Sequence, residues 1–381
     1  MKILVLSPGR NAEGGAERSA TLLVQGLVQR GHEVSVLGVE GSATAEFAAV
    51  GARTRLFPET TSHGKPMRHA GSAAILVGAA QSLPSTASAA STLRTEIRNF
   101  NPDVVYSNGA RTHLLAAATP IRVPIVWALR DVPPRALHRR LLRAGSRRCS
   151  MILANSSFTA EYLKPTPVQI EVVGNPVAVV ERADHDQAAE RLAIPSGRKV
   201  VVMVAHLHES KGHHVMIDAL AHWNGQDRPL LVIAGGQNYP GSDAYEQSLR
   251  EQADELGVAG EVVFLGNVRE MADVYSVADV LAHPAIHPEG FGRTIVEAQS
   301  ACVPVVATGL GGVAELCADG TNALLVQPGD SPALFAALQT ALNDKDVREQ
   351  LIASGFRTAA QFTPELHVDQ VEHLLAALAK E

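Results

Sequence analysis

Aromatic residues and cysteines are scarce in this chain. Phe, Trp and Tyr make up only 4% of its 381 residues while 46% are hydrophobic, so Val, Leu, Ile and Ala must build the cores. The three cysteines, Cys149, Cys302 and Cys317, are odd in number and lack CxxC spacing. This scarcity excludes a disulfide framework and a zinc knuckle, and it favours a reducing compartment.

Long hydrophobic runs are also absent. The apolar segment at residues 3–8 is too short for a signal peptide and predicts a buried strand. The most apolar stretch elsewhere, residues 70–80, contains glycine and is too short to cross a bilayer. We therefore expect a soluble, cytoplasmic protein, and a length of 381 residues indicates two domains.

Charge is distributed unequally, although the net charge is only −6. Residues 1–175 carry 20 Lys and Arg against 11 Asp and Glu, a balance of +9, and the remainder carries −15. The first half is therefore expected to meet an anionic partner. Nucleic acid is disfavoured because aromatic residues are not interleaved with the basic ones. An anionic membrane surface or a phosphate-bearing acceptor fits better.

One basic segment, between Arg135 and Arg148, is amphipathic. Leu137, Leu141 and Leu142 define its apolar side, and the arginines define its basic side. This pattern predicts peripheral contact with anionic lipid at the cytoplasmic face of a membrane. A solvated helix face is the alternative interpretation.

Apolar strands alternate with helices in both halves, which predicts an α/β protein with two doubly wound parallel sheets. Strands are expected in the first half at residues 2–8, 32–39, 103–107, 125–129, 151–155 and 170–174, and in the second half at 199–205, 230–235, 261–265, 279–282 and 303–307. Helices are expected at 15–30, 213–223, 243–256, 271–277 and 367–380.

We expect an N-terminal domain over residues 1–180 and a C-terminal domain over residues 181–365, separated within the polar stretch 181–198. The last segment, 366–381, could pack on either domain. Residues 63–92 are rich in Ala, Ser and Gly, and we interpret them as a helix, a flexible loop at 81–91 and a further helix that ends at Phe100.

The most informative motif runs from Glu289 to Glu297 and reads EGFGRTIVE. Gly290 and Gly292 form a turn before a predicted helix, whose free N–H groups and dipole favour a phosphate. Glycine lacks a Cβ, so a ligand can approach this backbone closely. Glu297, in the second helical turn, could accept hydrogen bonds from two ribose hydroxyls. A surface turn capped by acidic residues is the alternative.

Two further glycine turns follow predicted strands. Gly14 and Gly15 open the first helix, and residues 308–315 form a strand–glycine–helix junction expected beside the Glu289 loop. Both turns suit a phosphate, although a tight turn alone would also require glycine. The dinucleotide fingerprint G-x-G-x-x-G is absent from the first turn, which disfavours a dehydrogenase.

Lys211 follows the first strand of the second half, where a single ammonium group suits a diphosphate. Histidines crowd the same segment, at His206, His208, His213 and His214. No carboxylate–cysteine pattern accompanies them, so polar loop residues or phosphate hydrogen-bond donors are favoured over a metal site.

Asp131 follows a strand of the first half at its carboxyl end. It is a candidate to orient or deprotonate an acceptor hydroxyl. A role in the turn before Pro133 would explain it equally well.

Together these motifs resemble the GT4-type retaining glycosyltransferases, which have the GT-B fold. The resemblance covers nearly the whole chain and rests on Gly14-Gly15, Asn155-Ser156-Ser157, Val173-Gly174-Asn175-Pro176, Lys211-Gly212, the Glu289 to Glu297 motif, and Gly311-Gly312 with Glu315. It implies two Rossmann-like domains that face a central cleft. A UDP- or GDP-linked sugar donor would bind the C-terminal domain and the acceptor the N-terminal domain, with neither a cofactor nor a metal ion.

The resemblance also implies roles for individual residues. Glu289 would contact donor sugar hydroxyls, Lys211 the diphosphate, and Glu297 the ribose. With Asp131 as the acceptor contact, the candidate catalytic residues are Glu289, Asp131 and Lys211. The other donor-binding positions would be Gly15, His206, Gly290, Phe291, Gly292, Arg293 and Thr294, beside Lys211 and Glu297.

The chain departs from the family pattern in two segments. Ala205-His206-Leu207 stands where Gly-Arg-Leu is usual, which predicts weaker or pH-sensitive donor binding. The segment 127–131 lacks the histidine that relatives often have there, which leaves Asp131 as the acceptor contact. The expected activity is sugar transfer to a hydroxyl of a polysaccharide, glycolipid or natural product. The alternatives are a nucleotide-sugar epimerase or hydrolase, and a non-catalytic nucleotide-binding protein of the same fold.

Overall fold

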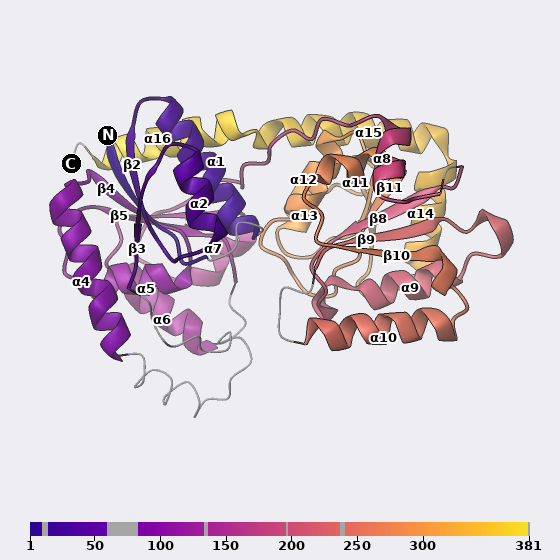
Figure 1. Ribbon diagram of the computed structural model, residues 1–381, viewed down its shortest axis with the longest axis horizontal. Coiled ribbons are helices and arrows are strands. Elements are labelled where there is room, and N and C mark those ends of the chain that lie inside the picture. The colour runs from indigo at the N-terminus through magenta and orange to yellow at the C-terminus, as the bar shows by residue number, and fades with distance from the viewer. Residues whose placement is uncertain (10–13, 59–82, 133–135, 196, 237–240, 380–381) are drawn as a thin grey trace. The chain divides into compact units, whose positions relative to one another are not determined.

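The computed structural model divides the chain into two units, each with its own parallel sheet (Figure 1). Unit 1 comprises Met1–Pro176 and Pro364–Glu381, and unit 2 comprises Val177–Thr363. The structure describes residues 1–9, 14–58, 83–132, 136–195, 197–236 and 241–379. Within these ranges, no helix is long and apolar enough to cross a bilayer.

Unit 1 is built on a seven-stranded parallel sheet of order β3-β2-β1-β4-β5-β6-β7. Its strands are β1 (Lys2–Leu6), β2 (Glu33–Gly38), β3 (Arg53–Leu56), β4 (Val104–Ser107), β5 (Ile125–Leu129), β6 (Met151–Ala154) and β7 (Ile170–Val172). Its described helices are α1 (Gly15–Gln29), α2 (Ser42–Ala49), α4 (Leu83–Phe100), α5 (Ala110–Ala118), α6 (Ala136–Ser146), α7 (Ser157–Leu163) and α16 (Pro364–Leu378).

Alternating strand residues bury opposite faces of this sheet, because successive side chains of a strand point to opposite sides. Ile3 and Val5 of β1 pack in one cluster with residues of α1, α2 and α16. Leu4 and Leu6 pack in another cluster with residues of α4, α5, α6 and α7. Both faces are therefore covered, as expected for a parallel sheet whose central strands are apolar.

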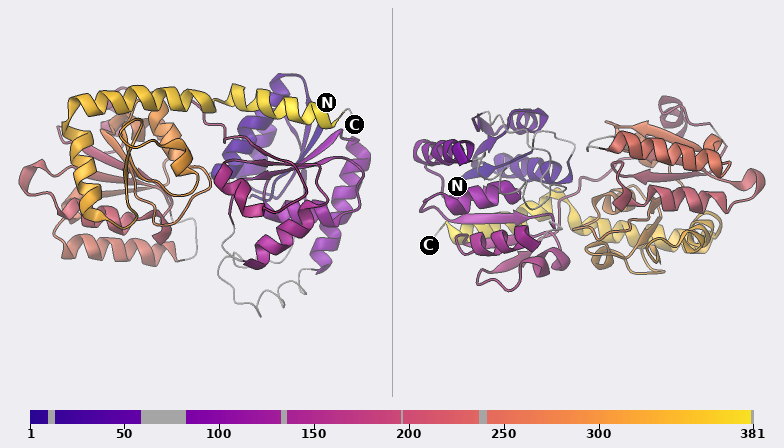
Figure 2. Two further views of the ribbon diagram at one scale, coloured as in Figure 1. Left: turned by 180° about the vertical axis from the view of Figure 1, so that it is seen from behind. Right: turned by 90° about the horizontal axis from the view of Figure 1, so that it is seen from below.

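The C-terminal helix α16 belongs to unit 1, which decides between the two packings left open by the sequence. It lies beside α1, as Figures 1 and 2 show in yellow and indigo. Arg30, at the end of α1, forms ion pairs of 2.6 Å with Asp369 and Glu372. His32 Nε2 lies 2.7 Å from the carboxylate of Glu372.

A glycine permits the close approach of α1 and α16. A Cβ on Gly26 would lie 2.5 Å from Cγ2 of Val368, which is itself buried. We therefore expect Gly26→Ala to lower the free energy of unfolding by about 1–2 kcal/mol, because overpacking outweighs the gain in helix propensity. Chemical denaturation measures this loss. In a chain that already carries Val368→Ala, Gly26→Ala should cost much less stability, because the clashing methyl group is gone. Additive effects of the two changes on the free energy of unfolding would contradict the contact.

Unit 2 carries a six-stranded parallel sheet of order β10-β9-β8-β11-β12-β13. Its strands are β8 (Val200–Val204), β9 (Leu230–Ala234), β10 (Val262–Gly266), β11 (Val280–His283), β12 (Val305–Thr308) and β13 (Leu324–Val326). Its described α-helices are α8 (His185–Arg191), α9 (His213–Ala221), α10 (Ser242–Glu255), α11 (Met271–Val277), α12 (Arg293–Ser300), α13 (Val313–Leu316), α14 (Ser331–Asn343) and α15 (Lys345–Ala359). Short 3₁₀ helices are η1 (Glu209–Lys211), η2 (Gly225–Asp227), η3 (Ala259–Glu261) and η4 (Ala360–Phe362).

The sheet of unit 2 is also covered on both faces. Val200 and Val202 pack with residues of α8, α11 and α12. Val201 and Met203 pack with residues of α9, α10 and α14. The predicted pair of doubly wound parallel sheets is therefore confirmed.

Some local predictions were wrong or incomplete. Within the predicted flexible loop at 81–91, residues from Leu83 onward belong to α4. Its first turns are Ala- and Ser-rich, which hides helical periodicity, and the helix is anchored further on by Leu93 and Phe100. The helix expected from residue 63 lies outside the described residues. Strands β3 and β13 were missed because they are short, and no residue in either is fully buried.

Candidate functional site

The strand order of unit 2 reverses between β8 and β11. The chain runs outward from β8 through β9 to β10, and from β11 through β12 to β13 on the other side. In doubly wound sheets, ligands bind outside the carboxyl ends of the strands at such a switch point. The segments that follow β8, β11 and β12 contain Lys211, Glu289 and the glycines at 309–312, and therefore meet at this edge.

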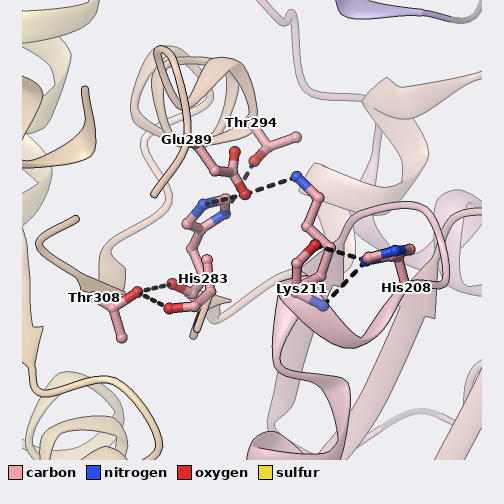
Figure 3. Close-up of polar contacts among 8 residues, drawn as sticks. His208, Lys211, His283, Glu289, Thr294 and Thr308 are labelled. Atoms are coloured by element: carbon pink, nitrogen blue, oxygen red, sulfur yellow. Dashed lines mark hydrogen bonds and ion pairs between the residues drawn. The ribbon is translucent and has the colours of Figure 1, made fainter. Parts of the chain in front are cut away.

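A cluster of polar and charged side chains occupies the switch point, and we call it the Glu289 cluster: Lys211, His283, Glu289 and Thr294. Figure 3 shows the Lys211 ammonium group and the His283 ring directed at the Glu289 carboxylate. Lys211 Nζ lies 2.7 Å and His283 Nε2 3.4 Å from Glu289 Oε1. The side chains of Lys211 and Glu289 are 18% and 19% exposed, so a ligand can still reach them.

The ionisation of Glu289 depends on these neighbours. Burial by itself would raise the pKa of Glu289, but the positive charge of Lys211 and the contact with His283 hold this pKa well below its usual range. The carboxylate is therefore ionised at neutral pH. An ionised carboxylate can accept hydrogen bonds from hydroxyl groups but cannot donate them.

Backbone geometry directs Lys211 into the cluster. The 3₁₀ turn η1 is separated from the end of β8 by four residues, and Ser210 donates its backbone N–H to Nδ1 of His208 over 3.1 Å. Gly212 follows with a φ of +77°, and a Cβ there would lie 1.9 Å from the carbonyl oxygen of Pro284. Only glycine allows the β8 and β11 loops to pass this closely.

The glycine turn before α12 is held against the loop after β12. Glu289 and Gly311 form a parallel bridge, and the N–H of Gly312 donates to the carbonyl oxygen of Glu289 over 2.8 Å. A Cβ on Gly312 would lie 2.3 Å from the carbonyl oxygen of Gly290. Gly292 caps α12 without a side-chain hydrogen bond, so the positive end of the helix dipole lies at this edge of the sheet.

The helix after β12 is shorter than the sequence suggested and contributes less to an anion site. The junction at 308–315 does lie beside the Glu289 loop, but α13 comprises only Val313–Leu316. A single turn sums few peptide dipoles, so α12 provides the principal helix N-terminus at this edge.

Glu297 is buried and held by two neighbours. Its Oε1 accepts from Arg293 Nε over 2.8 Å, and its Oε2 accepts from the Tyr275 hydroxyl over 2.9 Å. Each carboxylate oxygen has further acceptor capacity. Arg293 and Tyr275 therefore orient Glu297, and Tyr275, a fully buried residue of α11, had not been identified from the sequence.

Of the other sequence-predicted donor residues, Thr294 lies within the cluster, with its hydroxyl 3.4 Å from His283 Nδ1. Phe291 points into the core and stacks edge-on against Phe362, so its side chain is structural. His206 is half-buried after β8, with its ring 6.2 Å from that of His208.

Within the described residues, no group of three or more His, Cys, Asp or Glu is arranged to hold a metal ion.

His283 is the member of the cluster that sequence reasoning missed. It is the last residue of β11 and is almost completely buried. The available signal was a histidine at the carboxyl end of a buried strand that leads into the Glu289 motif. Such a strand end is where doubly wound sheets place binding residues.

In unit 1, Gly15 and Asp131 both follow strands at the carboxyl edge of the sheet. Gly15 begins α1, whose N-cap Gly14 makes no side-chain hydrogen bond. Glu17 folds back over this turn, since a Cβ on Gly14 would lie 2.3 Å from its Oε2. Burial raises the pKa of Glu17, and the nearby charge of exposed Asp131 adds to this rise.

Arg130, next to Asp131, is a second residue that sequence reasoning did not single out. Its Nε donates to Asn108 Oδ1 over 3.0 Å, one Nη donates to Tyr106 Oη over 3.1 Å, and the other donates to Asn175 Oδ1. All three acceptors are neutral, and among the described residues no carboxylate lies within ion-pair distance of Arg130. Two of its five N–H groups remain for a ligand.

The two halves of the chain match two family profiles. Residues 13–180 match the family described as Glycosyltransferase Family 4, and residues 184–358 match Glycosyl transferases group 1. Together these matches span nearly the whole chain. The boundary between them lies close to the boundary between the two units.

Curated relatives match part of the chain. A D-inositol 3-phosphate glycosyltransferase of Corynebacterium urealyticum is 36% identical over 203 residues, 52% of this chain and 47% of that protein. One from Corynebacterium glutamicum is 37% identical over 209 residues, 52% of this chain and 49% of that protein. The chain thus spans about half the length of the curated relatives it matches.

Solved structures match over the full length. Anabaena Alr3699/HepE, solved in complex with UDP and glucose, has a TM-score of 0.84 at 24% identity, over 99% of both chains. WaaG, a glycosyltransferase involved in lipopolysaccharide biosynthesis, has a TM-score of 0.72 at 16% identity, over 98% of this chain and 99% of that chain. These likenesses establish the fold. With its two profile matches and paired Rossmann-like sheets, the chain belongs to the GT4-type glycosyltransferases of the GT-B fold.

Proposed function

We propose that this protein is a retaining glycosyltransferase that moves a sugar from a UDP- or GDP-linked donor to an acceptor hydroxyl. The observation that carries the proposal is the Glu289 cluster at the switch point of unit 2, beside the uncapped N-terminus of α12. It places a cation, the N-terminus of a helix and an ionised carboxylate together. The first two suit a diphosphate and the carboxylate suits sugar hydroxyls.

In this proposal, Lys211 leaves its ion pair with Glu289 partly or wholly when the diphosphate enters. The ammonium group and the N–H groups of α12 then stabilise the charge that develops on the leaving diphosphate. Glu289, relieved of part of its ion pair, accepts hydrogen bonds from the donor sugar. Since these groups supply fixed positive charge, we propose transfer without a metal ion. Glu297, oriented by Arg293 and Tyr275, would hold the ribose.

Retention of configuration would follow from transfer on the same face of the sugar. A leaving phosphate oxygen would accept the proton of the attacking hydroxyl as the new bond forms. Most of the acceleration would then come from positioning and electrostatic stabilisation. Asp131 would orient the acceptor hydroxyl.

We further propose that the acceptor carries a phosphate. Arg130 is held in place by three neutral acceptors and lies next to Asp131. Burial lowers the pKa of both His113 and His367 to about 3, and the positive charge of Arg130 contributes to each shift. A guanidinium that has no ion-pair partner among the described residues suits a phosphate ester. The names of the curated relatives refer to such an acceptor.

Arg130→Gln should lower kcat/KM for D-inositol 3-phosphate by about 10–100-fold, the usual effect of losing a hydrogen bond between charged groups. The effect on unphosphorylated inositol should be smaller, so the ratio of the two values falls. Initial rates of nucleotide release measure both. Arg122→Gln, the same charge change at an exposed site of unit 1, is the control. An unchanged ratio in Arg130→Gln would argue against phosphate recognition.

The activity itself is tested with a panel of UDP- and GDP-linked sugars. Nucleotide release and proton NMR of the product report transfer and the configuration at the anomeric carbon. A transferred sugar with retained configuration supports the proposal. An epimerised or hydrolysed donor without acceptor would favour the epimerase or hydrolase alternative. Tight nucleotide binding without turnover would favour a non-catalytic protein, the alternative that His206 in place of the usual arginine suggests.

A further inference from the structure

Helix α6 presents an unusual exposed face. Leu137 and Leu141 are each 45% exposed, and Arg140 and Ala144 are exposed on the same side of the helix. Residues three and four positions apart share a face, so these four side chains form one continuous stripe, which we call the α6 stripe. The opposite side of α6 buries Leu142 and Ser146. This side fixes the helix on unit 1 and leaves the stripe outward.

Other exposed hydrophobic residues do not share this pattern. Among the large hydrophobic side chains described as exposed, Leu137 and Leu141 are the two that lie on one helix. Leu366, for comparison, stands alone on α16 next to Glu365. Isolated apolar residues are normal at a protein surface, whereas contiguous exposed apolar side chains with a polar rim are typical of an interaction site.

The charge around the α6 stripe is of one sign. Residues 132–160 contain six arginines and no Asp or Glu. Two of the arginines join α6 to α7: Arg139 lies over the Tyr162 ring at 5.8 Å, and Arg143 donates to the carbonyl oxygen of Leu163 over 3.1 Å. Asp131 and Glu161 are the acids that flank this stretch along the chain, and Glu161 is paired with Lys164 at 3.0 Å.

Three arginines remain for a partner. Arg140, Arg147 and Arg148 are exposed, and in the described part of the chain no hydrogen bond or ion pair joins their guanidinium groups to another residue. Arg140 lies within the stripe, and Arg147 and Arg148 extend it beyond the end of α6. A guanidinium group binds phosphate oxygens well while its stem lies along apolar surface.

We propose that the α6 stripe docks unit 1 onto a bilayer with anionic headgroups. Leu137 and Leu141 would enter the boundary between headgroups and acyl chains, and Arg140, Arg147 and Arg148 would contact lipid phosphates. The helix lies in the plane of the surface and does not cross the membrane. An acidic protein partner would account for the arginines. A bilayer accounts for both parts of the stripe, because it offers phosphates to the arginines and an apolar layer to the leucines.

Vesicle co-sedimentation of the full chain tests the proposal. Vesicles of equal parts phosphatidylglycerol and phosphatidylcholine are compared with vesicles of phosphatidylcholine alone. The wild type should bind the anionic vesicles and release them as salt is raised. Arg140→Gln/Arg147→Gln/Arg148→Gln should weaken binding by roughly 100-fold, at about fivefold for each basic residue. Leu137→Ser/Leu141→Ser should weaken it by at least about tenfold.

The control removes the same charge elsewhere on unit 1. Arg94, Arg98 and Arg122 are exposed, so Arg94→Gln/Arg98→Gln/Arg122→Gln has the same net charge as the α6 arginine variant. It should keep most of the vesicle binding. Circular dichroism melts check that all variants fold. Equal binding to the two vesicle types, no vesicle binding by the wild type, or equal losses in the α6 and control variants would overturn the proposal.

Discussion

Glu289→Gln is expected to lower kcat by about 10²–10³-fold, the range seen when one preorganised electrostatic contact to a transition state is lost. The change keeps the shape of the side chain but removes the charge that faces Lys211 and His283 at 2.7 and 3.4 Å. The bridge to Gly311 uses the backbone of residue 289 and is retained. Nucleotide release under saturating donor measures the effect.

The matched control is Glu255→Gln, which removes the same charge from an exposed position of unit 2. It should retain activity. Melting temperatures of both variants separate loss of chemistry from loss of fold. Turnover of Glu289→Gln close to that of the wild type would refute the proposed role of this carboxylate.

Lys211→Met is expected to weaken binding of UDP or GDP by about 10–100-fold, because a hydrogen-bonded charge contact to the diphosphate is lost. Met is similar in length and carries no charge. Isothermal titration calorimetry with the free nucleotide diphosphates measures the loss. Lys345→Met, at a side chain that is 84% exposed, is the control and should bind as the wild type does.

The same variant should change the ionisation of Glu289. In the wild type, burial raises the pKa of Glu289, but Lys211 and His283 lower it by more. Without Lys211, less positive charge opposes the effect of burial, and the pKa of Glu289 rises. Carbon-13 NMR titration of the Glu side chains measures the shift. A Glu289 titration that is unchanged in Lys211→Met would contradict the ion pair.

The pH dependence of stability follows from the same shift. Because the pKa of Glu289 is lower in the folded than in the unfolded chain, the ion pair contributes stability above the unfolded value near 4.5. That contribution declines as the pH falls below 4.5 toward the folded pKa. In Lys211→Met this loss of stability at low pH should be smaller, because the pKa values of Glu289 in the folded and unfolded chain lie closer together.

Much of the architecture was predictable because its signals are local. Buried parallel strands are short apolar runs, so β1, β5, β8 and β11 can be identified from a few consecutive residues each. Glycine turns such as Gly290 to Gly292 mark the junction between a strand and a helix. By contrast, β3 and β13 are only three or four residues long and are recognised through pairing with neighbours. The Ala- and Ser-rich start of α4 carries too little apolar pattern to distinguish helix from loop.

By itself, the sequence determined that the chain forms two parallel α/β sheets and that Glu289, Lys211 and Glu297 stand beside the turns where such sheets bind ligands. Only the tertiary structure decided which side chains meet there. His283 and Tyr275 reach Glu289 and Glu297 through the packing of β11 and α11, and Arg130 gains its partners from two segments that are distant in the sequence. Strand and helix periodicity is written in neighbouring residues, whereas these contacts depend on the order and register in which distant strands are paired.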